Sequence, residues 1–583
     1  MRKFLIKIST VIIAVLVLCT FIGCSTTQDE QPKLTAPEVV ISYDGLAVWG
    51  EVDNALHYIY VIDDGAETST AKCSVQLEEN RSIKVKAVSG KEGYADSDYS
   101  APQKYVKTAP VEHPHTDVNN DGICDKCSTS VTVELSFYAV NDLHGKVMDN
   151  SGSQPGVDEF TTYMKALYAD DAREEILLSS GDMWQGTVES SSNKGQLMTE
   201  WMNEVGFVSM TLGNHEYDWG AGVIASNAEL ANFPLLAINV TQDGKAVDYC
   251  QPSTVVERGG VKIGIIGAIG NCLSSISGDF TDGLEFATGG NLSALVKKES
   301  ERLRNEEDCD FIVFSIHDGG TGFSAAGVNY VTDGEIRYYD TALSDGYVDL
   351  VFEGHSHQRY ILQDKFGIYH LQGGGENSGI SSAEVTLNTA NGKYDVRPKL
   401  ISNSVYASSS IEGDPVVEQI FNKYFPDNNP YTTVLGTNAS RKNSDDITKQ
   451  VAKLYYEAGV KKWGSQYNIV FGGGYLNTRS PYVIEKGDVT YANIFSVLPF
   501  DNEIVLGKVN GSALRNLLSK TNYVNYATIS SNEIVDSKDY YIIVDSYSST
   551  YKYNNITEVA RLGSGTYARD LLAEFVAAGG WKR

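Results

Sequence analysis

From residue 131 onward, short apolar runs alternate with polar and amphipathic segments, and five of the runs are followed within three residues by Asp, Asn or His. These runs are residues 133–139, 176–179, 208–212, 311–316 and 348–352. After the first of them, Phe160, Tyr163, Met164 and Leu167 follow the spacing of one helix face. Alternating buried strands and helices predict an α/β sheet, and ligands of such sheets bind at the carboxyl ends of the strands.

The polar residues that follow these runs are chemically alike. They are Asp142 and His144, Asp182, Asn214 and His215, His317, and His355 and His357, so five of the nine histidines of the chain lie at strand ends. Imidazole nitrogens and carboxylate or amide oxygens, without a thiolate, suit borderline cations such as Mn, Fe or Zn. Without His215, seven such donors remain; they exceed one tetrahedral site and suit two divalent ions about 3.5–4 Å apart, an arrangement that promotes attack on a phosphoester.

The motifs Asp142-x-His144, Gly181-Asp182, Gly213-Asn214-His215-Glu216, His317 and Gly354-His355-x-His357 resemble, in order, those of the calcineurin-like metallophosphoesterases, in the layout of the secreted 5′-nucleotidase branch. The resemblance implies a four-layer α/β-β-α sandwich over residues 131–400. It implies that one metal is held by Asp142, His144, Asp182 and His357, and a second by Asp182, Asn214, His317 and His355. It also implies that His215 faces the phosphoryl group and that Asp218 orients its ring, while Glu216 is structural.

After a linker at 401–430, residues 431–583 form a second predicted α/β domain. Gly472-Gly473-Gly474, Arg479-Ser480-Pro481, Gly487-Asp488-Val489-Thr490 and Val497-Leu498-Pro499-Phe500 resemble the 5′-nucleotidase C-terminal domain. The resemblance implies that Arg479 and Arg441 bind the phosphate or nucleoside, and that Phe500 and Tyr547 stack on the base. The chain departs from the family at Phe471, which replaces an Asn, in three extra residues before Arg479, and in 548–555, which replace a glycine-rich loop. Phe500 as a plain core residue is the alternative.

The N-terminus is typical of an exported lipoprotein. Arg2, Lys3 and Lys7 precede an apolar stretch, Val11 to Leu18, and Phe21-Ile22-Gly23-Cys24-Ser25 resembles a bacterial lipobox. We therefore expect a signal peptide at 1–24, a lipid on Cys24, a tether at 25–34, and a chain outside the cytoplasm on the membrane; a retained signal anchor is the alternative. Residues 35–107 alternate short strands with turns and resemble a fibronectin type III-like β-sandwich, which we expect to act as a spacer.

Residues 108–130 form a linker rich in His, Asp and Cys that permits a Ca or a Zn site. Asp117, Asn119, Asp121 and Gly122 match the first half of an EF-hand loop, although Ser128 stands where Glu is expected. His113, His115, Cys124 and Cys127 form a zinc-type set instead, and a Cys124–Cys127 disulfide is a third interpretation. For Cys250, Cys272 and Cys309, buried thiols and disulfides are both open.

The net charge limits the classes of partner that this protein can bind. A net charge of −28 argues against a nucleic-acid polymer as partner, and no obligate protein partner is evident. The leading hypothesis is a lipid-anchored, two-metal phosphohydrolase that acts on nucleoside 5′-monophosphates. Alternatives are a 2′,3′-cyclic nucleotide phosphodiesterase, a UDP-sugar or nucleotide pyrophosphatase, and, in another class, a surface adhesion protein with an inactive phosphatase fold.

Overall fold

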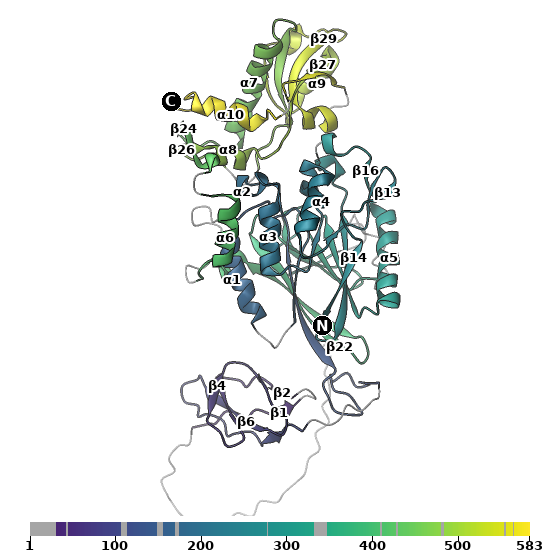
Figure 1. Ribbon diagram of the computed structural model, residues 1–583, viewed down its shortest axis with the longest axis vertical. Coiled ribbons are helices and arrows are strands. Elements are labelled where there is room, and N and C mark those ends of the chain that lie inside the picture. Colours follow the sequence, from purple (N-terminus) through teal and green to yellow (C-terminus); the bar gives the residue numbers. More distant parts are fainter. Residues whose placement is uncertain are drawn as a thin grey trace, which may run out of the picture. The chain divides into compact units, whose positions relative to one another are not determined.

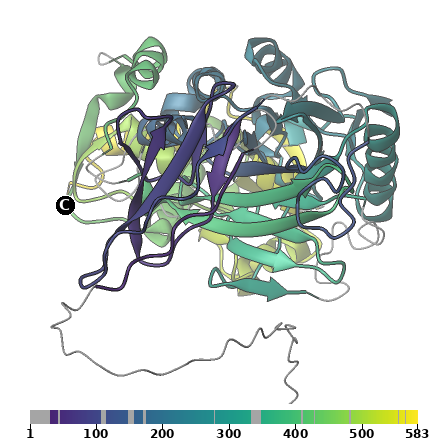
Figure 2. The same ribbon diagram turned by 90° about the horizontal axis from the view of Figure 1, so that it is seen from below.

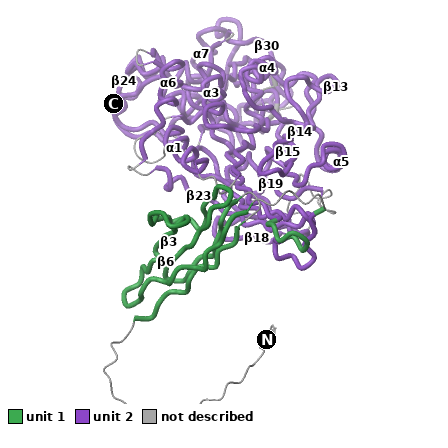
Figure 3. Tube along the Cα trace, turned by 60° about the horizontal axis from the view of Figure 1, so that its bottom comes forward, with its two compact units in different colours: residues 1–114, 124–130 green, residues 115–123, 131–583 purple. Residues whose placement is uncertain are grey.

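The computed structural model describes residues 31–41, 45–106, 114–147, 156–169, 174–276, 278–331, 347–407, 411–426, 429–479, 483–552, 555–563 and 565–582. The chain divides into two compact units, residues 1–114 with 124–130 and residues 115–123 with 131–583 (Figure 3). The predicted signal peptide, Cys24 and His113 lie outside the described residues. Across the described part of the chain, no helix has the length and apolar character needed to cross a membrane.

The first unit is a β-sandwich. One sheet has the order β1-β2-β5 and the other the order β4-β3-β6-β7. The strands are β1 (Val39–Ile41), β2 (Leu46–Trp49), β3 (Ala55–Ile62), β4 (Thr68–Thr70), β5 (Ser74–Gln76), β6 (Ser82–Ser89) and β7 (Gln103–Lys104). Alternate residues of β6, namely Ile83, Val85 and Ala87, are fully buried in a core that also contains Trp49 and Tyr58. The likeness to fibronectin type III stays a prediction.

The second unit begins with a sheet in the order β11-β10-β9-β8-β22-β23. The strands are β8 (Thr132–Val140), β9 (Glu174–Ser179), β10 (Ser209–Thr211), β11 (Leu235–Leu236), β22 (Gly379–Asn388) and β23 (Tyr394–Ser402). Strands β8 to β11 run parallel, whereas β22 and β23 are antiparallel to their neighbours. The carboxyl ends of β8, β9 and β10 therefore meet at one edge.

A second sheet has the order β14-β15-β17-β19-β21-β20-β18. Its strands are β14 (Ser253–Arg258), β15 (Val261–Ile269), β17 (Phe311–His317), β18 (Val328–Tyr330), β19 (Leu350–Glu353), β20 (Arg359–Gln363) and β21 (Tyr369–Gly373). Strands β15, β17 and β19 are parallel to one another, so their carboxyl ends also meet. Beside the two large sheets, a short ribbon is formed by β12 (Val240–Gln242), β13 (Lys245–Ala246) and β16 (Leu284–Phe286).

The two large sheets pack face to face, and helices cover their outer faces (Figure 1). In β8, Phe137 lies between the sheets, with its ring centroid 5.6 Å from that of Phe311, whereas Tyr138 packs under the helices. The helices are α1 (Val157–Tyr168), α2 (Val188–Ser191), α3 (Gln196–Val205), α4 (Ala221–Leu230), α5 (Gly289–Glu306) and α6 (Pro415–Tyr424). Helix α5 packs on the second sheet, along one side in both views (Figures 1 and 2). This is the predicted four-layer sandwich.

The C-terminal part has a sheet in the order β28-β25-β29-β27-β30, with apolar clusters on both faces. Its elements are β24 (Val434–Asn438), α7 (Ser444–Trp463), β25 (Ile469–Gly474), β26 (Gly487–Thr490), α8 (Tyr491–Val497), β27 (Ile504–Asn510), α9 (Gly511–Ser519), β28 (Val524–Ala527), β29 (Asp539–Asp545), β30 (Thr557–Arg561) and α10 (Ala568–Ala577). The segment 401–430, expected to be a linker, includes α6, which packs against α1 and α3. The connection between the domains is therefore itself part of the packed structure.

We predict that Phe137→Ala destabilises the two-sheet domain by about 3–5 kcal/mol, because the change empties space between the two sheets. Chemical denaturation followed by tryptophan fluorescence measures the loss, since Trp184 and Trp201 are buried in this domain. Tyr330→Ala is the control, as the Tyr330 side chain is 78% exposed. Equal denaturation midpoints for the two variants would contradict the assignment of Phe137 to the inter-sheet core.

Candidate active site

The predicted donor residues meet at the edge shared by the two sheets. Residues after β8, β9, β10 and β19 and the last residue of β17 form three overlapping groups whose ligand atoms lie within 4.8 Å of one another within each group. The groups are Asp142, His144 and His357; His144, Asp182 and His215; and Asp182, His317 and His355. Asp182 belongs to two of them. Asn214 joins the third, because its Oδ1 lies 2.9 Å from His355 Nδ1 and 3.2 Å from His317 Nε2.

The backbone is strained at these residues. Five of the donors have a positive φ, between 51° and 66°, although none of them is glycine. They are Asp142, His144, Asp182, His355 and His357. A left-handed conformation costs a residue with a Cβ on the order of 1–3 kcal/mol and persists only where the surroundings enforce it, which is common at functional sites. The concentration of strain therefore indicates that the directions of these side chains matter more than local stability.

Backbone carbonyls orient two of the imidazoles. His144 Nδ1 donates to the carbonyl of Gln185 at 2.9 Å, and His317 Nδ1 donates to that of Ser180 at 2.7 Å. Each bond leaves Nε2 facing the donor groups: His144 Nε2 lies 3.1 Å from His357 Nε2, and His317 Nε2 lies 3.1 Å from Asp182 Oδ2. A second hydrogen bond of this kind is how proteins fix the tautomer of a metal-binding histidine.

Burial and charge set the protonation states. Burial alone would raise the pKa of Asp142 and Asp182, but His357 acts on the first and His317 on the second, and both pKa values stay below the ordinary range. Burial lowers the pKa of His355 to about 4, and the charge of His317 adds to the effect. Ionised carboxylates and a neutral imidazole are the forms that bind a cation. His317 differs, because Asp182 raises its pKa to about 10 against the effect of burial.

This donor set fits divalent metal ions. Carboxylate oxygens, an amide oxygen and imidazole nitrogens converge with their lone pairs directed at the same small region, which a cation stabilises and an apolar filling does not. Asp142, Asp182 and Asn214 are each at most 1% exposed, so water does not compensate their polar groups freely. The residues predicted as ligands are thus brought together by the fold.

Glu216 ties two of the loops to each other. Its fully buried carboxylate accepts hydrogen bonds from the backbone N–H groups of Asp182 at 2.9 Å, Met183 at 2.9 Å and Gly213 at 2.7 Å. Gly213 must be glycine, because a Cβ there would lie 2.2 Å from Asp182 Oδ1. Glu216 therefore holds the loop after β9 against the loop after β10, which is a structural role.

His215 belongs to one donor group, with His144 and Asp182, and also lines the adjacent cavity. Its Nδ1 bonds to Asp218 Oδ2 at 2.7 Å, and its ring lies edge-on to that of His144, with centroids 5.2 Å apart. Its backbone N–H donates to Asp182 Oδ1 at 2.8 Å. Because Asp218 occupies Nδ1, the free ring atom is Nε2, and both residues line the cavity next to the site.

Gln372, which the sequence analysis did not identify, fixes the loop that carries His355 and His357. It is fully buried on β21, and its Oε1 accepts from Ser356 Oγ at 2.9 Å and from the backbone N–H of Gln358 at 2.8 Å. Its Nε2 donates to the Gly354 carbonyl at 2.9 Å and to Tyr360 Oη at 3.0 Å. Gln372 thus contacts the chain before, between and after the two histidines; no motif or spacing marked it, because it lies on a different strand.

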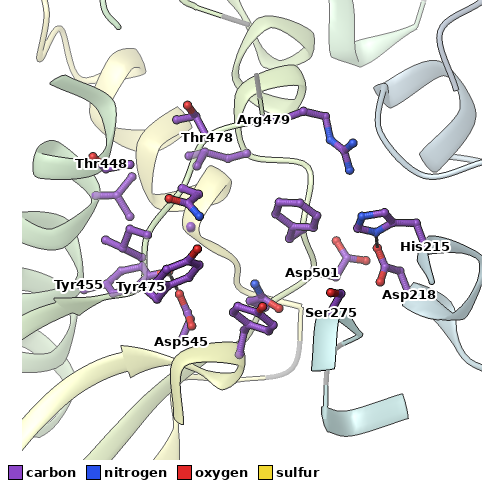
Figure 4. Close-up of a pocket in the computed structure, with 18 of the residues that line it drawn as sticks. His215, Asp218, Ser275, Thr448, Tyr455, Tyr475, Thr478, Arg479, Asp501 and Asp545 are labelled. Carbon is purple, nitrogen blue, oxygen red and sulfur yellow. Dashed lines mark hydrogen bonds and ion pairs between the residues drawn. The ribbon is translucent and has the colours of Figure 1, made fainter. Parts of the chain in front are cut away.

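A cavity of about 370 Å³ extends from His215 into the C-terminal domain (Figure 4). Of the four residues predicted to bind substrate, Arg479, Phe500 and Tyr547 line it. The Phe500 ring stacks on that of His215, with centroids 5.7 Å apart, and the Arg479 guanidinium lies 5.3 Å from the centre of the Phe500 ring. The structure does not bring Arg441 to this cavity, because its side chain is exposed and pairs with Glu485 at 3.1 Å.

Gln185 connects the two halves of the cavity and was also missed. Its Oε1 accepts from Arg479 Nη2 at 2.8 Å, and its Nε2 donates to the Pro499 carbonyl at 3.1 Å. Its backbone carbonyl is the acceptor that orients His144. One residue therefore contacts a candidate ligand, the arginine and the segment before Phe500, a coincidence that only the folded chain reveals.

We predict that Gln372→Leu lowers the affinity for Mn²⁺ about 10–100-fold, the range found when residues that orient metal ligands are changed. Three hydrogen bonds to the loop that carries His355 and His357, and one to Tyr360 on β20, are lost while the volume is retained. Calorimetric titration of metal-free protein measures the affinity. Gln363→Leu is the control, because Gln363 lies on the adjacent β20 and bonds only to the carbonyl of Gly367 at its own turn. Unchanged affinity in the Gln372 variant would rule out its positioning role.

Comparison with known proteins gives two family matches. Residues 135–359 match the calcineurin-like phosphoesterase family, and residues 431–533 match the 5′-nucleotidase C-terminal domain. Among curated relatives, a protein from Yersinia enterocolitica named UshA is 24% identical, over 70% of this chain and 78% of that protein. A protein from Vibrio cholerae named 5′-nucleotidase is 23% identical, over 67% of this chain and 75% of that protein.

The fold also has solved counterparts. The crystal structure of a 5′-nucleotidase precursor from Thermus thermophilus aligns with a TM-score of 0.58 at 18% identity, covering 77% of this chain and 97% of that one. The two domain matches occur in the order that the sequence motifs indicated. The chain therefore belongs to the calcineurin-like metallophosphoesterases that carry a 5′-nucleotidase C-terminal domain, a family of hydrolases.

Proposed function

We propose that this protein is a two-metal phosphohydrolase that releases phosphate from nucleoside 5′-monophosphates. The observation that carries the proposal is that the donor groups and the cavity share a residue. His215 lies with the donor groups, and it also lines the cavity, together with Arg479 and Phe500. A phosphoryl group fits the cationic, metal-binding end, and a flat base fits the aromatic part.

We assign Asp142, His144, Asp182 and His357 to one divalent ion, and Asp182, Asn214, His317 and His355 to the other. Asp182 belongs to both sets, in keeping with its place in two of the donor groups. Mn, Zn and Fe all suit these ligands. When bound, such a pair neutralises phosphate oxygens and activates the attacking water.

His215 supplies a proton or a hydrogen bond to the phosphoryl group or the leaving oxygen. Asp218 holds the ring through Nδ1, which leaves Nε2 to face the phosphoryl group. Arg479 is the cation of the cavity wall and retains guanidinium N–H groups beyond the one bonded to Gln185. Phe500 and Tyr547 offer ring surface to the base.

The cellular location that we propose rests on the N-terminal sequence. We propose that export and lipidation at Cys24 place the enzyme outside the cytoplasm on the membrane surface. The basic start, the short apolar core and the Gly23-Cys24 pair support this. The negative net charge is compatible with a small anionic substrate, because the metal site provides a local positive centre.

We predict that His215→Ala lowers kcat for AMP by about 10²–10⁴-fold, the usual contribution of a positioned general acid. Metal content, measured by elemental analysis, stays near two ions per chain, because His215 is outside both assigned ligand sets. Asp218→Asn gives a smaller loss, since the ring is kept but held less firmly. Full turnover in the His215 variant would refute the role, and loss of metal would assign His215 to ligation instead.

We predict that Phe500→Ala raises KM for AMP about tenfold, because an aromatic stacking contact contributes about 0.5–1.5 kcal/mol. KM for p-nitrophenyl phosphate, which has no nucleoside, changes far less. Parallel changes for both substrates would show that Phe500 acts on His215 by packing rather than on the base. A panel of AMP, 2′,3′-cyclic AMP and a UDP-sugar, with the products separated by chromatography, distinguishes the enzyme alternatives, because AMP yields adenosine and phosphate, the cyclic nucleotide yields 2′- or 3′-AMP, and the UDP-sugar yields UMP and a sugar phosphate. No product from any substrate would favour the adhesion alternative.

A further inference from the structure

The cavity continues well beyond the catalytic histidine. Figure 4 shows His215 and Asp218 at one end, and Thr448, Tyr455 and Asp545 at the other. Thr448 and Tyr455 belong to α7, and Asp545 is the last residue of β29. We call this far part, lined by Thr448, Tyr455, Tyr475 and Asp545, the inner end. A monophosphate whose phosphoryl group lies beside His215 extends its nucleoside toward it.

Asp545 is the chemically unusual group of the inner end. It is 4% exposed, and its Oδ1 accepts from the backbone N–H of Ser548 at 2.6 Å, while Tyr455 Oη donates to Oδ2 at 3.4 Å. The Ser548 side chain is a third hydrogen-bond partner. A carboxylate offers roughly four acceptor positions, so capacity for a further donor remains. Among the described residues, no Lys or Arg forms an ion pair with Asp545. Burial raises its pKa against the pull of Ser548 and Tyr455.

A buried carboxylate without a cation is costly to the fold, and the cost falls when a ligand supplies the missing donors. Aromatic rings stand around it. The Tyr475 ring centroid lies 6.3 Å from that of Tyr547, and both residues line the cavity. Flat apolar walls with an acceptor-only group at the end suit a heterocycle or sugar that presents hydrogen-bond donors.

We propose that Asp545 recognises a pair of adjacent hydrogen-bond donors on the nucleoside part of the substrate, and so sets the nucleotide preference of the enzyme. The N1–H and 2-amino groups of guanine form such a pair, and so does the 2′,3′-diol of ribose. Either pair matches the two oxygens of one carboxylate. The inference rests on the proposed function, since it assumes that the phosphoryl group lies at the catalytic end.

Two substrate comparisons separate the two sources. GMP, IMP and AMP differ in the donors of the base, whereas AMP and 2′,3′-dideoxy-AMP differ only in the diol. We expect kcat/KM to fall about tenfold or more in at least one comparison when the donor pair is removed, because hydrogen bonds to a charged group are of this strength. Equal kcat/KM throughout both comparisons overturns the proposal.

Asp545→Asn tests the residue itself. It keeps the size of the side chain and an acceptor for Ser548, but it removes the charge and places a donor opposite the donors of the substrate. We expect the preference to disappear, with kcat/KM for the preferred nucleotide about 10–100-fold lower, and hydrolysis of p-nitrophenyl phosphate unchanged. Asp488→Asn, an exposed aspartate of the same domain outside the cavity, is the matched control and should change neither. An equal loss for GMP, IMP, AMP, 2′,3′-dideoxy-AMP and p-nitrophenyl phosphate would indicate a structural role and contradict recognition.

Binding of the free nucleosides makes the test independent of hydrolysis. Calorimetric titration with guanosine, inosine, adenosine and 2′,3′-dideoxyadenosine measures the same discrimination without a phosphoryl group. Discrimination in binding without any phosphate release would leave this inference standing and refute the proposed function. Phosphate release from nucleotides, without discrimination among them, would support the proposed function and refute the role of Asp545 in recognition.

Discussion

The carboxylate of Asp182 connects every part of the catalytic end. Its Oδ1 accepts from the backbone N–H of His215 at 2.8 Å, and its Oδ2 lies 3.1 Å from His317 Nε2. Its own N–H is bonded to Glu216. Because His215 and Glu216 follow β10 of the first sheet and His317 ends β17 of the second, this one residue connects the two sheets at their shared edge. The absence of a Cβ on Gly213 is what lets Asp182 lie this close to the neighbouring loop.

The rigidity around this carboxylate has a physical cost. Five donors adopt left-handed backbone conformations, and Asp142 and Asp182 are buried with their charges. The fold compensates with a buried hydrogen-bond network in which Glu216 holds the loops after β9 and β10, and Gln372 holds the loop after β19. Such networks stabilise one arrangement over its alternatives because an unsatisfied buried polar group is expensive. The strain and the network are two aspects of the same preorganisation.

The C-terminal domain completes the site rather than merely covering it. Gln185 bonds to Arg479 and to the carbonyl of Pro499, and Arg561 pairs with Asp279 through two contacts of 2.9 and 3.0 Å. Phe500 of the C-terminal domain thus stacks on His215 of the other domain. Gln185 orients His144 through its backbone carbonyl and accepts from Arg479 through its side chain, so the candidate metal ligands and the side chains proposed to bind substrate share one set of hydrogen bonds.

The sequence by itself determined the elements and chemistry of the catalytic end. Apolar runs followed by Asp, Asn or His predict strands. In a parallel sheet the carboxyl ends of neighbouring strands lie at the same edge, so these polar residues are expected to lie close together. Their oxygen and nitrogen donors predict metal binding. Strand position and donor type are local properties, so the order of residues is enough to predict them. The helix spacing of Phe160 and Met164 likewise predicted α1.

Only the tertiary structure decided which distant residues support and extend the site. Gln372, Gln185 and Asp545 have no motif. The roles of Gln372 and Gln185 depend on contacts with residues 12 to 314 positions away, and that of Asp545 depends on the walls of a cavity. Arg441 and Arg479 looked alike in the chain, yet the fold directs one to solvent and the other to His215 and Phe500. Packing between elements, which the order of residues does not encode locally, sets those directions.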